Sequence, residues 1–289
     1  MTEPARRCPT TASTSGSSPS RTPNGGSSSR RPGRDPPRSW GSFARVLLAL
    51  DTSTEWASVA LFDGRDVLGE ETWRAQRRHG DELFGAIERL LLSTRTALAS
   101  VDRIAVATGP GSFTGLRVAI AAGQGIARGS GASLVGISTL DVLAYPHAPS
   151  KLRTCPLLPA GRDQYYAAFY QERNRKWQRR SPFIVATLPE LSRQIGTHTL
   201  FVGELDAEVE TTLRDLLGPN AIFASPASRM RRAGYLAELG WKELESTKQV
   251  KMAEIEPLYV RQPSIRVSFD QPFAPPPTDE RALGLPKRS

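Results

Sequence analysis

Cysteine and histidine are both scarce in this chain of 289 residues. The two cysteines, Cys8 and Cys155, lie far apart in the sequence, so they offer neither a disulfide framework nor a CxxC metal site. The three histidines are His79, His147 and His198, and no two of them have the spacing of an HExxH or HxxxH site. The sequence therefore disfavours a zinc hydrolase, and its cysteine content fits a reducing compartment.

Long apolar runs are absent as well. No stretch reaches eighteen consecutive apolar residues, so we expect a soluble body and no helix that crosses a membrane. The GxSxG motif of serine hydrolases does not occur, and Cys155 is interpreted as a small buried hydrophobe rather than a nucleophile. With 39% hydrophobic and 23% charged residues, the chain can bury the core of one sizeable domain or two small ones.

Acidic residues are fewer than basic ones, but the imbalance is local. The formal net charge is +9, and residues 1–45 contribute +6 of it, from eight Arg against Glu3 and Asp35. The remaining residues carry only +3, so charge does not predict a nucleic-acid groove in the folded part. Direct tRNA binding through the basic tail is disfavoured too, because Trp40 is the only aromatic residue among its first forty residues that could stack on a base.

Residues 1–45 are expected to be disordered. Twenty-five of the first forty residues are Ser, Thr, Pro or Gly, so little apolar surface is available to offset the entropy of ordering. The segment has no apolar stretch typical of a secretory signal, and it fits either a solvated tail or a Ser- and Arg-rich organelle transit peptide. Alternatively, the true start of the protein lies near Val46. The proline-rich residues 269–289 are expected to form a second flexible tail.

The chain between these tails alternates strand and helix patterns, and its second half repeats the first in reduced form. A duplicated β-β-β-α-β-α unit is typical of the two-lobed actin-like and Hsp70-like ATPase (ASKHA) fold, an α/β fold with mixed sheets. We expect one lobe over 46–148 and a smaller one over 149–268. The predicted strands are 46–51, 57–63, 66–73, 103–107, 133–136, 154–159, 164–171, 177–185 and 199–203. The predicted helices are 79–98, 112–128, 138–145, one from Leu188, 206–217 and 228–247.

Two motifs follow strands and could hold a phosphate. The sequence A-L-D-T-S-T ends the first strand and places Asp51, Thr52 and Ser53 there, although such residues also form simple turns. The sequence G-P-G-S-F-T-G-L-R begins a helix at 109–117, where free amides can bind an anion; a tight strand-to-helix turn is the alternative. Neither the dinucleotide fingerprint nor a Walker loop is present.

The helix over 112–128 contains three glycines, each of which costs about 1 kcal/mol relative to alanine. Small residues recur at every fourth position and form a ridge that allows another helix to approach closely. That helix is either the internal one at 79–98 or one from another chain. The ridge consists of Gly115, Ala119, Gly123 and Ala127.

Three sequence blocks resemble the TsaB (YeaZ) family. They are L-L-A-L-D-T-S-T at 47–54, A-V-A-T-G-P-G-S-F-T-G-L-R-V-A-I-A-A-G-Q-G-I-A-R-G at 105–129 and V-G-I-S-T-L-D-V-L-A at 135–144. The likeness continues in A-G-R-D-Q-Y-Y-A-A-F-Y at 160–170 and E-P-L-Y-V-R at 256–261, so it covers about 46–265. The family pattern has Asp-Ala-Arg where this chain has Ala-Gly-Arg, which puts any role of that acidic position in doubt.

The resemblance implies a non-catalytic dimerisation subunit of the machinery that places threonylcarbamoyl on N6 of adenosine 37 in tRNA. The implied partners are the transferase TsaD and the ATPase TsaE, with tRNA bound through the complex, and a homodimer can form without TsaD. The compartment is cytoplasmic. TsaD carries an HxxxH metal pair, where this chain has Thr139 and Leu143, so neither catalysis nor a metal is expected. The alternative function is an enzyme, either a glycoprotease-like metallopeptidase or a nucleotide-hydrolysing relative of sugar kinases and Hsp70.

The resemblance also assigns site residues. No cofactor is expected for the chain alone, because the segment F-V-G-E-L at 201–205 lacks the consecutive glycines of the second phosphate clamp, so ATP or ADP would bind only in the complex. A vestigial phosphate site is expected at Asp51, Thr52, Ser53, Gly109, Gly111 and Ser112. The partner interface is expected at Leu83, Ile87, Leu90, Gly115, Val118, Ala119, Ala122, Gly123 and Ile126.

Overall fold

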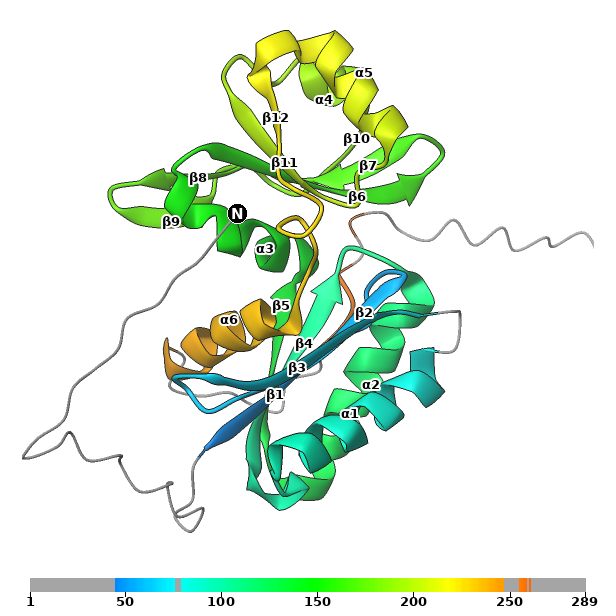
Figure 1. Ribbon diagram of the computed structural model, residues 1–289, viewed down its shortest axis with the longest axis vertical. Helices are drawn as coiled ribbons and strands as arrows, with labels where there is room; N and C mark the ends of the chain where they lie inside the picture. Colours follow the sequence, from blue (N-terminus) through cyan, green and yellow to red (C-terminus); the bar gives the residue numbers. More distant parts are fainter. Residues whose placement is uncertain (1–44, 76–78, 247–254, 259, 261–289) are drawn as a thin grey trace, which may run out of the picture. The chain divides into compact units, whose positions relative to one another are not determined.

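The computed structural model describes residues 45–75, 79–246, 255–258 and 260, and it contains two mixed sheets with helices on their faces (Figure 1). Apart from Arg45, the two segments expected to be tails lie outside the described residues. Within these ranges no helix combines the length and the apolar character that crossing a bilayer requires.

The first sheet has the strand order β3-β2-β1-β4-β5. Strand β1 pairs antiparallel with β2 and parallel with β4, so the sheet is mixed as predicted. The strands are β1 (Val46–Asp51), β2 (Trp56–Phe62), β3 (Val67–Arg74), β4 (Val101–Gly109) and β5 (Ser133–Ser138).

Helices cover both faces of this sheet, and this explains the unbroken apolar run in β1. Leu48 and Leu50 pack toward α1 (His79–Thr94) and α2 (Phe113–Ser130), whereas Leu47 and Ala49 pack against α6 (Ala233–Ser246). A strand that is buried on both faces reads as a continuous hydrophobic segment rather than an alternating one. Figure 1 shows α1 and α2 on one side of the sheet and α6 on the other.

The second sheet repeats the same pattern with the order β10-β7-β6-β11-β12, and a small β8-β9 hairpin branches from β6. Helices α4 and α5 cover one face and α3 packs on the other. The strands are β6 (Arg153–Gly161), β7 (Gln164–Ala167), β8 (Tyr170–Arg173), β9 (Lys176–Arg179), β10 (Ile184–Thr187), β11 (Thr199–Gly203) and β12 (Ala221–Phe223). The helices are α3 (Thr139–Ala144), α4 (Leu188–Ser192) and α5 (Ala207–Leu217), with 3-10 turns at Leu98–Ser100, Tyr145–Ser150 and Gly218–Asn220.

The duplicated two-lobed α/β fold is therefore confirmed, with corrections in the second half. The segment predicted as one strand over 177–185 is two strands, β9 and β10, because Ser181 and Pro182 interrupt it. Strand β12 was not predicted. The expected lobe boundaries also need correction, since α6 was assigned to the lobe at 149–268 but packs on the first sheet. Conversely, α3 contributes Leu140 and Leu143 to the core of the second sheet.

Candidate functional site

The small-residue ridge of α2 faces the first sheet of its own chain, which corrects its assignment to a partner interface. Ala119 and Ala122 are buried in the core beneath α2. A Cβ atom on Gly123 would lie 2.6 Å from Cγ1 of Val106 and 3.3 Å from Cδ1 of Leu134. The ridge therefore lets α2 approach the sheet closely.

The interface residues predicted on α1 are also part of this core. Leu83 is fully buried, and Ile87 and Leu90 are almost fully buried, because they form the stripe of α1 that packs on the sheet. Of the residues predicted on α2, Val118 and Ile126 are only partly buried and remain at the margin of the core. The helices were predicted correctly, but most of the residues chosen on them lie on the inner face.

The outer face of these helices carries the exposed apolar groups that sequence reasoning missed. Phe84 and Leu92 on α1 are 56% and 70% exposed, and Phe113 at the start of α2 is 42% exposed beneath the guanidinium of Arg117. Further along α2, Gly125 is exposed, and a Cβ atom there would meet nothing within 4 Å. We define the outer face as Phe84 and Leu92 of α1 with Phe113, Ala121 and Gly125 of α2.

The six residues predicted to hold a phosphate do come together, at the ends of β1 and β4. The amide of Ser112 donates to the carbonyl oxygen of Ser53 at 2.6 Å, and the hydroxyl of Thr52 donates to the carbonyl oxygen of Gly115 at 2.6 Å. The hydroxyl of Ser112 caps α2 by accepting from the amide of Gly115 at 3.3 Å. The two loops thus bind each other directly.

A buried ion pair occupies the centre of this site. Asp51 is fully buried, and its Oδ1 accepts from the amide and the hydroxyl of Ser53 at 2.9 and 2.6 Å. Its Oδ2 accepts from Nε of Arg231, whose side chain is only 3% exposed. The guanidinium also donates to the hydroxyl of Thr54 at 2.9 Å and to the carbonyl oxygen of Trp56 at 2.8 Å. Both oxygens of the carboxylate are therefore in use.

Three glycines of these loops lie close to backbone carbonyl oxygens of other segments. A Cβ atom at Gly111 or Gly115 would collide with the carbonyl oxygen of Ser53 or Thr52, so these glycines serve the contact between the loops. Gly109 has a φ of 108° and lies beside the carbonyl oxygen of Leu258. The two loops are therefore joined by direct contacts, and Arg231 supplies the positive charge beside Asp51.

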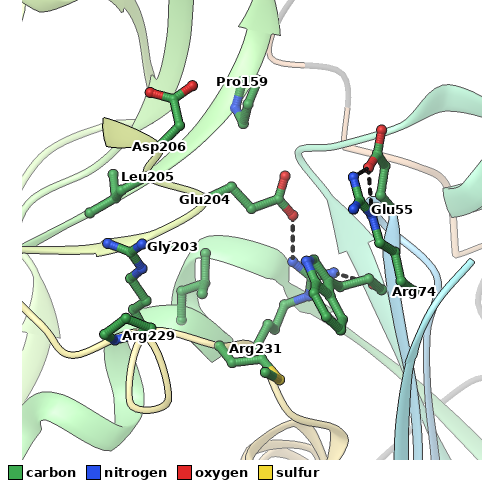
Figure 2. A pocket seen from close by; sticks show the side chains of 13 residues that line it. Glu55, Arg74, Pro159, Gly203, Glu204, Leu205, Asp206, Arg229 and Arg231 are labelled. Atoms are coloured by element: carbon green, nitrogen blue, oxygen red, sulfur yellow. Dashed lines mark hydrogen bonds and ion pairs between the residues drawn. The ribbon is translucent and has the colours of Figure 1, made fainter. Parts of the chain in front are cut away.

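A cavity of about 540 Å³ opens next to this ion pair, between the two sheets (Figure 2). Figure 2 shows Glu204 and Arg231 pointing toward each other, with Oε1 of Glu204 3.8 Å from the guanidinium and without a hydrogen bond of its own. At the rim, Arg74 pairs with Glu55 at 2.9 Å, and Arg229 pairs with Glu210. The basic groups that line the cavity, Arg74, Arg229 and Arg231, therefore each have a carboxylate partner.

Side chains that could ligate a metal do not gather in the part of the chain that the structure describes. Those residues contain no cluster of three His, Cys, Asp or Glu side chains that could hold a metal ion. At the positions of the implied histidine pair, the Thr139 hydroxyl is buried without a partner and Leu143 lines the cavity. Cys155 is fully buried as predicted, and burial raises the pKa of its thiol, so it is not a nucleophile.

The residues that the sequence analysis missed differ in whether the sequence contained a signal that could have identified them. Phe84 and Leu92 lie outside the stripe that contains Leu83 and Ile87, so a stricter helical projection would have separated them as a second apolar face. Arg231 gave no signal, because it is 180 residues from Asp51 and lies in a loop directly before another arginine, Arg232.

Comparison with known sequences identifies related proteins. The family described as TsaD, tRNA N6-adenosine threonylcarbamoyltransferase, matches residues 73–182. The tRNA threonylcarbamoyladenosine biosynthesis protein TsaB of Haemophilus influenzae is 31% identical over 238 residues, which cover 75% of this chain and 93% of that protein. The protein of the same name in Bacillus subtilis is 27% identical over 204 residues, which cover 70% of this chain and 89% of that protein.

The solved structure of YeaZ from Pseudomonas aeruginosa resembles the fold described above. It superposes with a TM-score of 0.62 at 26% identity and covers 75% of this chain and 100% of that one.

Proposed function

Because the chain belongs to the TsaB (YeaZ) family, we propose that it is the non-catalytic dimerisation subunit of the machinery that makes threonylcarbamoyladenosine at position 37 of tRNA. In this role the chain binds and supports TsaD, which carries out the transfer. The observation that supports the proposal most directly is the outer face of α1 and α2, where Phe84 and Leu92 are exposed although both helices are otherwise well packed.

The outer face suits a helical partner. Large apolar side chains anchor protein interfaces, and their exposure in an isolated chain is unfavourable unless a partner covers them. On α2, Ala121 and Gly125 are small and exposed, so a helix of the partner can approach its backbone closely. We assign this face to TsaD and, when TsaD is absent, to a second copy of the chain.

The proposal that the chain is not itself the enzyme is supported by the strand-end site. Asp51 and Arg231 form a buried pair, and the paired charges of the cavity leave no cation for a triphosphate. We therefore assign nucleotide binding and turnover to the complex with TsaD and TsaE rather than to this chain. Because its pathway acts on tRNA, we place the protein in the cytoplasm. No observation on the described residues favours a metallopeptidase or a nucleotide-hydrolysing enzyme.

The test is the affinity of the chain for purified TsaD, measured by calorimetry. Replacing both Phe84 and Leu92 by Glu should weaken binding by about thirtyfold or more, because loss of a central anchor typically costs about 2 kcal/mol or more. The melting temperature should change little, since both side chains are exposed. Leu216→Glu on α5 is the matched control, because Leu216 is 43% exposed on the second sheet. Unchanged TsaD binding by the double variant would contradict the proposed interface.

A further inference from the structure

The β8-β9 hairpin is a part of the second sheet to which the proposed function gives no role. Its strands are joined by a two-residue turn in which Asn174 and Arg175 have φ values of 53° and 60°. Strand β8 contacts β6 only at the pair Tyr170 and Thr154, so the rest of the hairpin extends beyond the sheet (Figure 1). Its sequence, Q-E-R-N-R-K-W-Q-R-R at 171–180, contains five basic residues and one acidic residue.

One face of the hairpin fixes it to the protein. Residues directly opposite each other on paired antiparallel strands share a face, so Tyr170, Glu172, Trp177 and Arg179 lie together. The hydroxyl of Tyr170 donates to Oδ1 of Asp141 in α3 at 2.6 Å, and the Tyr170 ring stacks on Trp177 with 6.4 Å between centroids. These contacts hold the hairpin in one orientation, and its only carboxylate is on this face.

The opposite face consists only of amides and cations. The register pairs Gln171 with Gln178 and Arg173 with Lys176, and all four side chains are exposed. Arg175 in the turn is exposed too. We call Gln171, Arg173, Arg175, Lys176 and Gln178 the basic ribbon. None of its three cations forms an ion pair with a described residue, whereas arginines elsewhere, such as Arg89 and Arg232, do so.

This arrangement is unfavourable for the isolated chain. Arg173 and Lys176 are directly opposite each other beside the turn, and like charges at such a position destabilise a hairpin. An anion between the two side chains would remove the repulsion and receive hydrogen bonds from both. Glutamine amides at the neighbouring pair would add uncharged donors. The face is therefore suited to a row of anionic oxygens.

We propose that the basic ribbon binds the phosphate backbone of RNA. Arginine and lysine supply most protein contacts to phosphates, and glutamine side chains also donate to phosphate and sugar oxygens. A membrane surface fits less well, because the ribbon has no exposed apolar side chain to insert among lipids. The proposal rests on the proposed function in one respect, that the RNA is the tRNA on which TsaD acts, and it adds a direct contact from this chain to that tRNA.

The experiment compares two triple variants of the full chain. The ribbon variant combines Arg173→Gln, Arg175→Gln and Lys176→Gln. The matched control variant combines Arg65→Gln, Lys151→Gln and Arg193→Gln. Each loses two Arg and one Lys from exposed positions, and each keeps the basic N-terminal segment. The affinity for a tRNA transcript is measured by fluorescence anisotropy between about 50 and 300 mM KCl. Across this range of salt concentration, the affinity that comes from phosphate contacts falls as the salt concentration rises. Binding to TsaD is measured in parallel on the same samples.

If the ribbon contacts phosphates, its variant should bind tRNA about tenfold more weakly at 100 mM salt, and the slope of log affinity against log salt should fall by about two to three. The control variant should bind tRNA with nearly the affinity and salt slope of the unchanged chain. Both variants should bind TsaD normally. Equal affinities and slopes in the two variants would overturn the proposal while leaving the TsaD interface intact. Weaker TsaD binding by the ribbon variant, with unchanged tRNA binding, would assign the ribbon to a protein partner and would also overturn it. If even the unchanged chain fails to bind TsaD, the proposed function fails, but the comparison of tRNA affinities still decides the ribbon's role.

Discussion

Arg231 supplies the buried cation at the end of β1. Its guanidinium reaches Asp51, Thr54 and the carbonyl oxygen of Trp56 from a loop that is distant in sequence. A buried ion pair of this kind adds little stability compared with apolar packing, but removing one partner leaves a buried charge uncompensated. The pair therefore holds the loop before α6 to the first sheet.

Two neighbouring arginines allow this statement to be tested. Arg231→Gln should lower the free energy of unfolding by about 3–5 kcal/mol, because Asp51 remains buried without its partner. Arg232→Gln should cost about 1 kcal/mol or less, since Arg232 pairs with Glu70 while its own side chain is 51% exposed. Urea unfolding of both variants provides the measurement. A similar loss of unfolding free energy in both variants would show that the pair of Asp51 and Arg231 contributes no more to stability than the exposed pair of Glu70 and Arg232.

His147 gives a prediction about pH. Burial lowers the pKa of His147 below its usual value of 6.5, and its Nε2 is buried without a hydrogen-bond partner. The folded state therefore holds this proton less tightly than the unfolded state does. The stabilising contribution is present above pH 6.5 and is lost as the pH falls through the folded pKa. Urea midpoints at pH 8 and pH 5.5 should differ less for His147→Asn than for the unchanged chain. His198→Asn, at an exposed position, should keep the full difference because it retains His147.

Helix α2 illustrates how far an element can be predicted from its sequence. The sequence predicted a helix over 112–128, with Ser112 or Thr114 as its cap; the structure places it at Phe113–Ser130 with Ser112 as the N-cap. The sequence did not predict which neighbour the glycine ridge of α2 faces, because small residues permit close approach to either a helix or a sheet. The local sequence pattern does not show which of the two packs against the ridge. The β8-β9 hairpin was missed for a similar reason, since its alternation merges with that of the adjoining strands.

Two glycines two residues apart on α2 distinguish its inner and outer faces. Gly123→Leu should reduce the free energy of unfolding by about 1–3 kcal/mol, because the added side chain overlaps Val106 and Leu134. Gly125→Leu should leave stability unchanged or raise it by up to about 1 kcal/mol, since leucine favours the helix and the position is open. Binding to TsaD should weaken only in Gly125→Leu. A stable Gly123→Leu variant that fails to bind TsaD would restore the ridge as the interface.

At the scale of the whole molecule, the repeated strand order explains why the fold could be predicted. Each half contains a mixed sheet whose first strands form an antiparallel hairpin, and the apolar runs and turns of the sequence show that pattern. What could not be predicted is the exchange of helices, in which α6 packs on the first sheet and α3 on the second. The packing of α6 on the first sheet brings Arg231, just before that helix, to Asp51. The part of the site that sequence reasoning missed thus depends on tertiary packing between distant segments.

The central claim is that the chain supports TsaD without being the catalyst. Reconstitution of threonylcarbamoyl transfer to tRNA from purified components tests it most directly. We predict no transfer by this chain alone, transfer by the mixture with TsaD and TsaE, and strongly reduced transfer when the Phe84→Glu, Leu92→Glu variant replaces the unchanged chain. Transfer by the chain alone at the rate of the complete mixture would contradict the claim.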